Sequence, residues 1–123
     1  MLHRIFVYGT LRIGGKANHQ MKKARLVKSG VALLGFKMYD LGAYPVVVPA
    51  FGSENVITGD IYLVDKETLW RLDDYEGQEY KRIQVQSISA MIYVAKSAQV
   101  IQDANPIVEG DWLKHLKINY FTK

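Results

Sequence analysis

Two short segments of the chain carry residue types that suit chemistry on a small anionic molecule. Tyr8-Gly9-Thr10-Leu11 follows an apolar, β-forming stretch, and Asp73-Asp74-Tyr75-Glu76 ends the most helix-like stretch. A glycine directly after a strand lets the backbone turn sharply, so that successive N–H groups point into one concavity that suits a carboxylate or a phosphate. An ordinary turn that ends a strand explains the same residues, and both interpretations remain open at this point.

The acidic segment offers a candidate proton-transfer group. Leu69, Leu72 and Glu76 are spaced i, i+3, i+7 and therefore share one helix face. We expect the two leucines to be buried against a sheet, which brings Glu76 to the edge of the apolar layer, where desolvation raises the pKa of a carboxylate and makes it a better base near neutral pH. Asp73 is the competing candidate, and Asp74 is expected to face water. The alternative is a solvated acidic helix end, although acids there oppose the helix dipole.

Other catalytic and metal-binding patterns do not match the chain. A Walker phosphate loop needs Gly at position 10 and Ser or Thr at position 17, where the chain has Thr10 and Ala17. The serines lack a G-x-S-x-G elbow, and the acids at 73–76 are too close together to flank a sugar as in glycosidases. The chain has no cysteine, and its three histidines show no metal-ligand spacing: His3, His19 and His115. We therefore expect no metal site.

The elements that must position these residues are short and mostly strands. We expect strands over 3–8, 30–39, 46–49, 56–64, 80–87 and 90–95, a helix from Asn18 to about Val27, a helix over 66–75 capped by Asp65, and a terminal helix capped by Asp111. Gly59, inside one strand, suits a bulge or a close approach by another group. The predicted fold class is α+β, a small, mostly antiparallel sheet or barrel with two or three helices against it.

Length and composition set the frame for this fold. The chain has 123 residues, 49% of them apolar and 23% charged, which predicts one globular domain over 1–123 and excludes disordered and fibrous classes. No apolar run approaches the roughly 20 residues that span a bilayer, and the N-terminus lacks a signal-peptide cleavage pattern, so we expect a soluble, cytoplasmic protein without a membrane partner. The net charge is only +4, and the basic segment 22–28 is interpreted as a solvated helix face, so no nucleic-acid partner is expected.

Six segments, taken in order, carry a family resemblance that covers nearly the whole chain. They are Phe6-Val7-Tyr8-Gly9-Thr10-Leu11-Arg12 with Asn18-His19, Tyr44-Pro45, Gly59-Asp60-Ile61-Tyr62 with Asp65, Leu72-Asp73-Asp74-Tyr75-Glu76-Gly77, Tyr80 with Arg82, and Gly110-Asp111-Trp112. The set resembles the gamma-glutamylcyclotransferase-like family, with most similarity to its gamma-glutamylamine cyclotransferase branch and small bacterial relatives.

The resemblance implies a fold and a reaction. The fold is a small mixed β-barrel flanked by helices, with a pocket at one end. In the reaction, the α-amino group of a small-molecule γ-glutamyl substrate attacks its own γ-carbonyl and releases 5-oxoproline with an amine or amino acid, without a cofactor. By the same resemblance, the substrate's γ-glutamyl head group is bound by Tyr8, Gly9, Thr10 and Leu11, and Glu76 moves the proton.

Elementary chemistry agrees with these implied roles. A backbone nest binds one compact carboxylate without a metal, a single carboxylate can take and return a proton, and closing a five-membered ring within one molecule makes positioning the main task. Tyr80 is a candidate hydrogen-bond partner of the oxyanion or the substrate, although packing explains a strand tyrosine equally well. Arg82 is interpreted as structural. The alternative function is a binding protein for γ-glutamyl or amino-acid-like molecules that does not turn them over.

Overall fold

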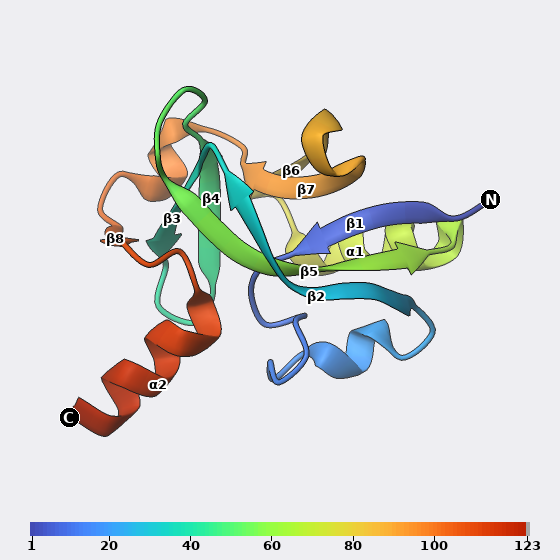
Figure 1. Cartoon of the computed structure of the whole chain (residues 1–123), viewed down its shortest axis with the longest axis horizontal. Coiled ribbons are helices and arrows are strands. Elements are labelled where there is room, and N and C mark those ends of the chain that lie inside the picture. Colours follow the sequence, from blue (N-terminus) through green and yellow to red (C-terminus); the bar gives the residue numbers. More distant parts are fainter. Residues whose placement is uncertain (123) are drawn as a thin grey trace.

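The computed structural model describes residues 1–122, which form an α+β fold of two sheets and two α-helices (Figure 1). The strands are β1 (His3–Val7), β2 (Arg25–Leu34), β3 (Phe36–Asp40), β4 (Pro45–Pro49), β5 (Val56–Val64), β6 (Tyr80–Val85), β7 (Ala90–Ala95) and β8 (Asn105–Ile107). The α-helices are α1 (Lys66–Glu76) and α2 (Trp112–Thr122), and three short 3₁₀ turns are η1 (Asn18–Met21), η2 (Gln86–Ile88) and η3 (Ala98–Ile101). Within the described residues, no helix has the length and apolar character needed to cross a bilayer.

The strands form two separate sheets rather than one closed cylinder. The larger has the order β2-β5-β1-β7-β6, and the smaller has the order β4-β3-β8. All the pairings are antiparallel except β1 with β7, which run parallel with Ile5 opposite Met91. The larger sheet ends at β2 on one side and β6 on the other, so it stays open. The predicted α+β class is therefore confirmed, and the predicted barrel is not.

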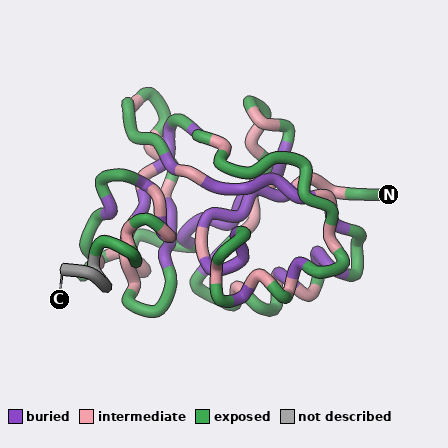
Figure 2. Tube along the Cα trace, turned by 60° about the horizontal axis from the view of Figure 1, so that its bottom comes forward, coloured by how far each residue is buried: buried purple, intermediate pink, exposed green. Residues whose placement is uncertain are grey.

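The first strand lies at the centre of the molecule and serves two apolar clusters. Ile5 and Val7 pack into a cluster with Leu69 and Leu72 of α1, because successive side chains of a strand point to opposite faces. Phe6 and the following Tyr8 project to the other face, into a cluster shared with β3 and β4, β8 and the start of α2. Figure 2 shows the buried residues gathered along these central strands. Burial on both faces explains why Ile5, Phe6 and Val7 form a continuous apolar run without alternation.

The helix predicted from Asn18 to about Val27 is wrong. Only the 3₁₀ turn η1 forms there, and the chain is already extended at Arg25, where β2 begins to pair with β5. The basic segment 22–28 is therefore a turn followed by an exposed edge strand, not one face of a helix. The strand predicted over 30–39 is also divided, because Gly35 adopts φ +91° between β2 and β3.

The predicted helix ends agree well with the structure. Asp65 caps α1, since its Oδ1 accepts a hydrogen bond of 2.7 Å from the Thr68 N–H. The helix ends after Glu76 because Gly77 adopts φ +80°, a conformation that favours glycine. The cap predicted for α2 is also confirmed, with Asp111 Oδ1 accepting from the Lys114 N–H at 3.1 Å.

The sheet predictions for the hairpin and for Gly59 are also confirmed. The β6–β7 hairpin forms with Ile83 opposite Ile92. At Gly59 another group approaches closely, because a Cβ there would lie 2.6 Å from Phe6 Cζ and would overlap the Val7 carbonyl oxygen. The absence of a side chain at Gly59 thus makes room for the Phe6 ring and the end of β1 beside β5.

Candidate active site

All the residues proposed for a site line one cavity of about 200 Å³. Tyr8, Gly9, Thr10 and Leu11 come from the loop after β1, Glu76 is the last residue of α1, and Tyr80 is the first residue of β6. The rest of the wall is formed by Phe6, Val7, Tyr44, Pro45, Tyr75 and Tyr93. None of these lining residues is a lysine, an arginine or a histidine, so the groups on this wall that can receive an anion are N–H and O–H donors.

A tight turn shapes the loop after β1. The Arg12 N–H donates to the Gly9 carbonyl oxygen at 3.1 Å, which makes Thr10 and Leu11 the central residues of the turn. The hydrogen bond that closes such a turn uses neither of the two central N–H groups. Gly9 itself lies against Pro45, where a Cβ would come within 2.9 Å of the ring carbons Cγ and Cδ. The loop therefore reaches this wall of the cavity only because residue 9 has no side chain.

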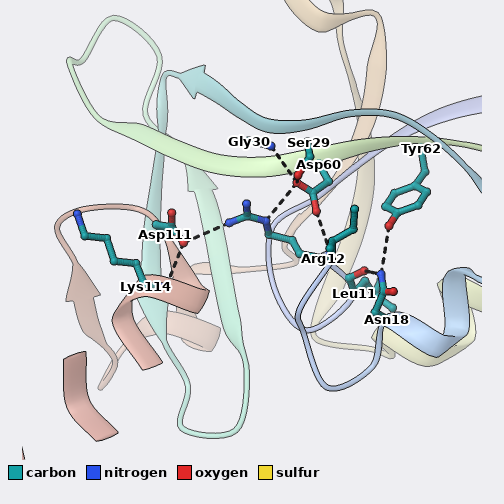
Figure 3. A network of polar contacts seen from close by, with 10 residues as sticks. Leu11, Arg12, Asn18, Ser29, Gly30, Asp60, Tyr62, Asp111 and Lys114 are labelled. Atoms are coloured by element: carbon teal, nitrogen blue, oxygen red, sulfur yellow. Dashed lines mark hydrogen bonds and ion pairs between the residues drawn. The ribbon is translucent and has the colours of Figure 1, made fainter. Parts of the chain in front are cut away.

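A buried network of polar contacts holds the loop in place (Figure 3). Arg12 is only 8% exposed, and its Nη1 donates to Asp111 Oδ1 at 3.2 Å while its Nε lies 3.4 Å from Asp60 Oδ1. Asp60 is completely buried and accepts hydrogen bonds from the Ile13 N–H at 3.0 Å and the Ser29 hydroxyl at 2.8 Å. The loop is thus anchored both to β5 and to the start of α2.

Asn18 anchors the other side of the same loop. Its Nδ2 donates to the Leu11 carbonyl oxygen at 2.9 Å and to the Tyr62 hydroxyl at 3.1 Å (Figure 3). With the Leu11 carbonyl turned toward Asn18, the loop backbone is fixed in one orientation. Arg12, Asn18, Asp60, Tyr62 and Asp111 all belong to the motif segments quoted above, and three of the six segments therefore meet around one loop.

Glu76 is the last residue of α1 and lines the wall of the cavity. Among the described residues, no group donates a hydrogen bond to the Glu76 carboxylate. Burial, and after it the negative charge of Asp73, raise the pKa of Glu76 from 4.5 to about 7. Both protonation states are therefore populated near neutral pH, which is the condition for a group that takes and returns a proton.

Asp73, the competing candidate, has the opposite surroundings. Its Oδ1 accepts from the Tyr93 hydroxyl at 2.6 Å and from Arg82 Nε at 2.9 Å, and its Oδ2 accepts from Arg82 Nη2 at 3.0 Å. Burial raises the pKa of Asp73, but the hydrogen bonds from Arg82 and Tyr93 outweigh it and hold that pKa below its usual value. Asp73 lines a neighbouring surface hollow rather than the main cavity. Two carboxylates one helical turn apart thus have pKa values that are pushed apart.

Two buried tyrosines on the cavity wall donate their hydroxyl protons in hydrogen bonds to backbone carbonyl groups. The Tyr80 hydroxyl donates to the Pro45 carbonyl oxygen at 2.7 Å, and the Tyr8 hydroxyl donates to the Tyr93 carbonyl oxygen at 2.8 Å. Burial raises the pKa of both phenols. Because each proton is held by a carbonyl, both phenol oxygens offer the cavity acceptors. In this arrangement Tyr80 does not donate to a developing oxyanion.

Sequence reasoning missed three tyrosines of the cavity wall. Tyr75 and Thr10 share a hydrogen bond of 3.0 Å between their hydroxyls, and the Tyr44 hydroxyl donates to Glu79 Oε1 at 3.2 Å, which keeps Glu79 outside the cavity wall. Tyr93 could have been found, because the predicted hairpin pairs it with Arg82 on the face that also carries Tyr80. In the described part of the chain, no group of three or more His, Cys, Asp or Glu side chains is placed to hold a metal ion.

Comparison with known proteins adds a decisive observation to this geometry. A family model described as "Gamma-glutamyl cyclotransferase, AIG2-like" matches residues 5–114, a span that includes both the loop after β1 and Glu76. The chain belongs to this family. The resemblance inferred from the motif segments is therefore confirmed.

Several relatives within the family cover most of the chain. The Escherichia coli K12 gamma-glutamylcyclotransferase family protein YtfP is 37% identical over 114 residues, which is 89% of this chain and 96% of YtfP. Its solution structure matches with a TM-score of 0.68 over 91% of this chain and 97% of that one. A Vibrio cholerae relative is 33% identical over 94% of this chain and its own full length. A Niallia circulans relative, gamma-L-glutamyl-butirosin B gamma-glutamyl cyclotransferase, is 33% identical over 58% of this chain and 44% of its own.

Proposed function

We propose that this chain is a γ-glutamyl cyclotransferase in which Glu76 is the general acid and base. The α-amino nitrogen of a γ-glutamyl compound forms a bond to its own γ-carbonyl carbon, and the bond from that carbon to the leaving nitrogen breaks. The products are 5-oxoproline and a free amine or amino acid. Atoms and charges balance without a co-reactant, because the α-ammonium nitrogen loses two protons as it becomes the lactam N–H and the leaving nitrogen gains two as it becomes an ammonium group.

The loop after β1 is proposed to bind the γ-glutamyl head group. The N–H groups of Thr10 and Leu11, central in the turn, suit the α-carboxylate of the head group. The phenol oxygens of Tyr8 and Tyr80 act as acceptors and suit the α-ammonium group, because their own protons are held by carbonyl groups. Binding both charged groups of the head group fixes the attacking nitrogen close to the γ-carbonyl, which is the main requirement of a ring closure within one molecule.

The observation that carries the proposal is that Glu76 and the loop after β1 line the same cavity. A carboxyl group with a pKa of about 7 accepts one proton at a time from the attacking nitrogen, before and after the new bond forms, and passes each to the leaving nitrogen at similar cost. The name of the Niallia circulans relative, which describes a gamma-glutamyl cyclotransferase acting on a gamma-glutamyl compound, supports the same reaction class.

The test is release of 5-oxoproline from a panel of γ-glutamyl amines, γ-glutamyl amino acids and glutathione. We expect turnover by the wild type and a loss of at least about 100-fold in kcat for Glu76→Gln, because the amide conserves the shape but cannot transfer the proton. The matched control is Glu79→Gln, which makes the same change three residues away at an exposed glutamate. This control is expected to keep turnover within a few-fold of the wild type.

Three outcomes would contradict the proposal. Equal loss in both variants, or unchanged turnover in Glu76→Gln, would remove the role assigned to Glu76. A wild-type protein that is folded, shows a raised melting temperature with γ-glutamyl compounds and releases no 5-oxoproline would instead be a binding protein for these molecules.

A further inference from the structure

The cluster of Asp73, Arg82 and Tyr93 has no role in the proposed reaction, although it lies directly behind Glu76. These three residues and Glu76 line the same hollow between the end of α1 and the β6–β7 hairpin. Asp73 precedes Glu76 by three residues on α1, so the two carboxylates lie on neighbouring positions of one helix face. The position of the charge on Asp73 therefore matters to Glu76 directly.

Asp73 is held by its partners more firmly than a surface aspartate. Two nitrogens of the Arg82 guanidinium bind its two oxygens at 2.9 and 3.0 Å, a bidentate geometry that fixes the plane of the carboxylate. The remaining guanidinium nitrogen, Nη1, contacts Met91 Sδ at 2.8 Å, so Arg82 is itself held along the hairpin. The Tyr93 hydroxyl adds a hydrogen bond of 2.6 Å.

The same cluster reaches the opposite wall of the cavity through Tyr93. The side chain of Tyr93 donates to Asp73, while its backbone carbonyl accepts from the Tyr8 hydroxyl at 2.8 Å. One residue of β7 thus links the carboxylate beside Glu76 to the residue that begins the loop after β1. A displacement of Asp73 is therefore expected to move Glu76 on one wall of the cavity and, through Tyr93, Tyr8 on the other.

We propose that Asp73, clamped by Arg82 and Tyr93, is a positioning residue that fixes a negative charge beside Glu76 and ties it to Tyr8 across the cavity. The inference rests on the proposed function for its catalytic meaning, but the electrostatic part holds whether or not the chain turns over a substrate. Asp73 stays ionised and takes no part in proton transfer, which leaves Glu76 as the carboxyl group that exchanges protons near neutral pH.

The other titratable groups that face Glu76 leave this role to Asp73. Four tyrosines around Glu76 have raised pKa values, so these phenols are uncharged near neutral pH; they are Tyr8 after β1, Tyr44 before β4, Tyr80 on β6 and Tyr93 on β7. Tyr75 shares its hydroxyl hydrogen bond with Thr10, and Lys81 on β6, which also lines the hollow, is a cation and not an acid. Arg82 on β6 is cationic and is paired with Asp73. Among the described groups, Asp73 is therefore the ionised acid whose charge acts on Glu76.

The test is a titration of the Glu76 side-chain carboxyl by ¹³C NMR in the full-length protein, with Glu76→Gln used to assign its signal. In Asp73→Asn we expect the Glu76 midpoint to move to lower pH by roughly 0.5–1 unit, because a neighbouring negative charge is removed. Asp73→Glu, which keeps the charge, is expected to restore the midpoint. The matched control is Asp74→Asn, which removes the same charge from the next, exposed position and is expected to leave the midpoint in place.

An unchanged Glu76 midpoint in folded Asp73→Asn, or an equal shift in Asp74→Asn, overturns the proposal. If Asp73→Asn does not fold, Arg82→Gln replaces it: loss of the clamp is expected to raise the Asp73 midpoint by about one unit, and an unmoved midpoint contradicts the proposal. In an active enzyme, the acid limb of kcat/KM against pH follows the NMR midpoint in each variant. Because the NMR titration needs no substrate, a chain without turnover disproves the proposed function and still tests this inference.

Discussion

At the scale of single residues, hydrogen-bond donors distinguish two carboxylates that the sequence places side by side. Asp73 receives three hydrogen bonds from Arg82 and Tyr93, whereas no described group donates to Glu76. A carboxylate that loses water without gaining donors is destabilised in its charged form. Glu76, the residue best suited to move a proton, therefore lowers the stability of the folded chain at high pH, where its carboxyl group is charged.

Because the charged form of Glu76 is destabilised in the folded chain, we predict that Glu76→Gln stabilises the protein under alkaline conditions. The pKa of Glu76 is about 7 in the folded chain against an ordinary 4.5, so folding takes up a proton between these values. The contribution of Glu76 to stability is fully present below pH 4.5 and is lost as the pH rises through about 7. At pH 8 we expect the free energy of unfolding of Glu76→Gln to exceed that of the wild type by about 1–3 kcal/mol, a gain that disappears near pH 4.5. Urea unfolding at both pH values measures it, and an equal difference at the two values would contradict the assignment.

The sequence predicted the orientation of the acidic residues better than their partners. The i, i+3, i+7 spacing placed Leu69, Leu72 and Glu76 on one face and Asp74 in water, as the structure has them. The clamp on Asp73 depends on Arg82 and Tyr93, which meet it only after the hairpin packs against α1. Periodicity within one element identifies a face, but it does not identify which groups another element brings to that face.

At the scale of elements, the loop after β1 takes its shape from contacts with other segments rather than from its own sequence. Arg12 joins this loop to Asp60 on β5 and to Asp111 before α2, and Asp60 also accepts from residues of the loop and of β2. A completely buried carboxylate that is surrounded by donors organises all of them at once.

We therefore expect Asp60→Asn to lower the free energy of unfolding by about 2–4 kcal/mol, because an amide N–H₂ group replaces one acceptor oxygen among these donors. The control is Asp111→Asn. The side chain of Asp111 is 24% exposed, and an asparagine there still caps α2, so we expect a loss below about 1 kcal/mol. Chemical denaturation of the two variants provides the comparison. Similar losses in the free energy of unfolding of both variants would show that the burial of Asp60 does not increase its contribution to stability.

The wrong helix prediction over 18–27 has its cause at the same scale. Asn18 and the lysines that follow suit a helix locally, but Arg25 to Leu34 pair with β5 along the edge of the larger sheet. Asn18 itself turns its amide toward the Leu11 carbonyl oxygen and Tyr62 instead of capping a helix. Pairing with a distant strand outweighs a weak local helical preference, and a single window of sequence does not contain that information.

At the scale of the whole molecule, β1 contributes side chains to both apolar clusters, as β4, β5 and β7 also do. One cluster holds α1 against the larger sheet, and the other holds the smaller sheet and α2, with Trp112 only 1% exposed. The sequence predicted short antiparallel strands and hence the α+β class, but closure into a barrel depends on the pairing of edge strands, which β2 and β6 do not make.

The shared strands predict that the chain unfolds as one unit, in line with a single domain over residues 1–123. The two tryptophans provide a clear test, because Trp70 on α1 is 57% exposed while Trp112 is buried at the start of α2. In Trp70→Phe the fluorescence reports on Trp112 alone, whereas far-ultraviolet circular dichroism reports on all elements. We expect the two denaturation curves to coincide. Loss of the Trp112 signal at a lower denaturant concentration would indicate that α2 and the smaller sheet form an independent unit.

The central place of the first strand also has a consequence for synthesis on the ribosome. β1 pairs with β5, where His3 lies opposite Val64, and with β7, where Ile5 lies opposite Met91. At roughly 5–20 residues per second, its second partner is translated several seconds after β1 itself. Until β7 emerges, at least one edge of this apolar strand is unpaired, and the loop that follows it lacks the part of the cavity wall formed by Tyr93. The cavity is therefore complete only after Tyr93 has been translated, so a chain truncated before β7 is expected to bind chaperones and to lack the complete cavity.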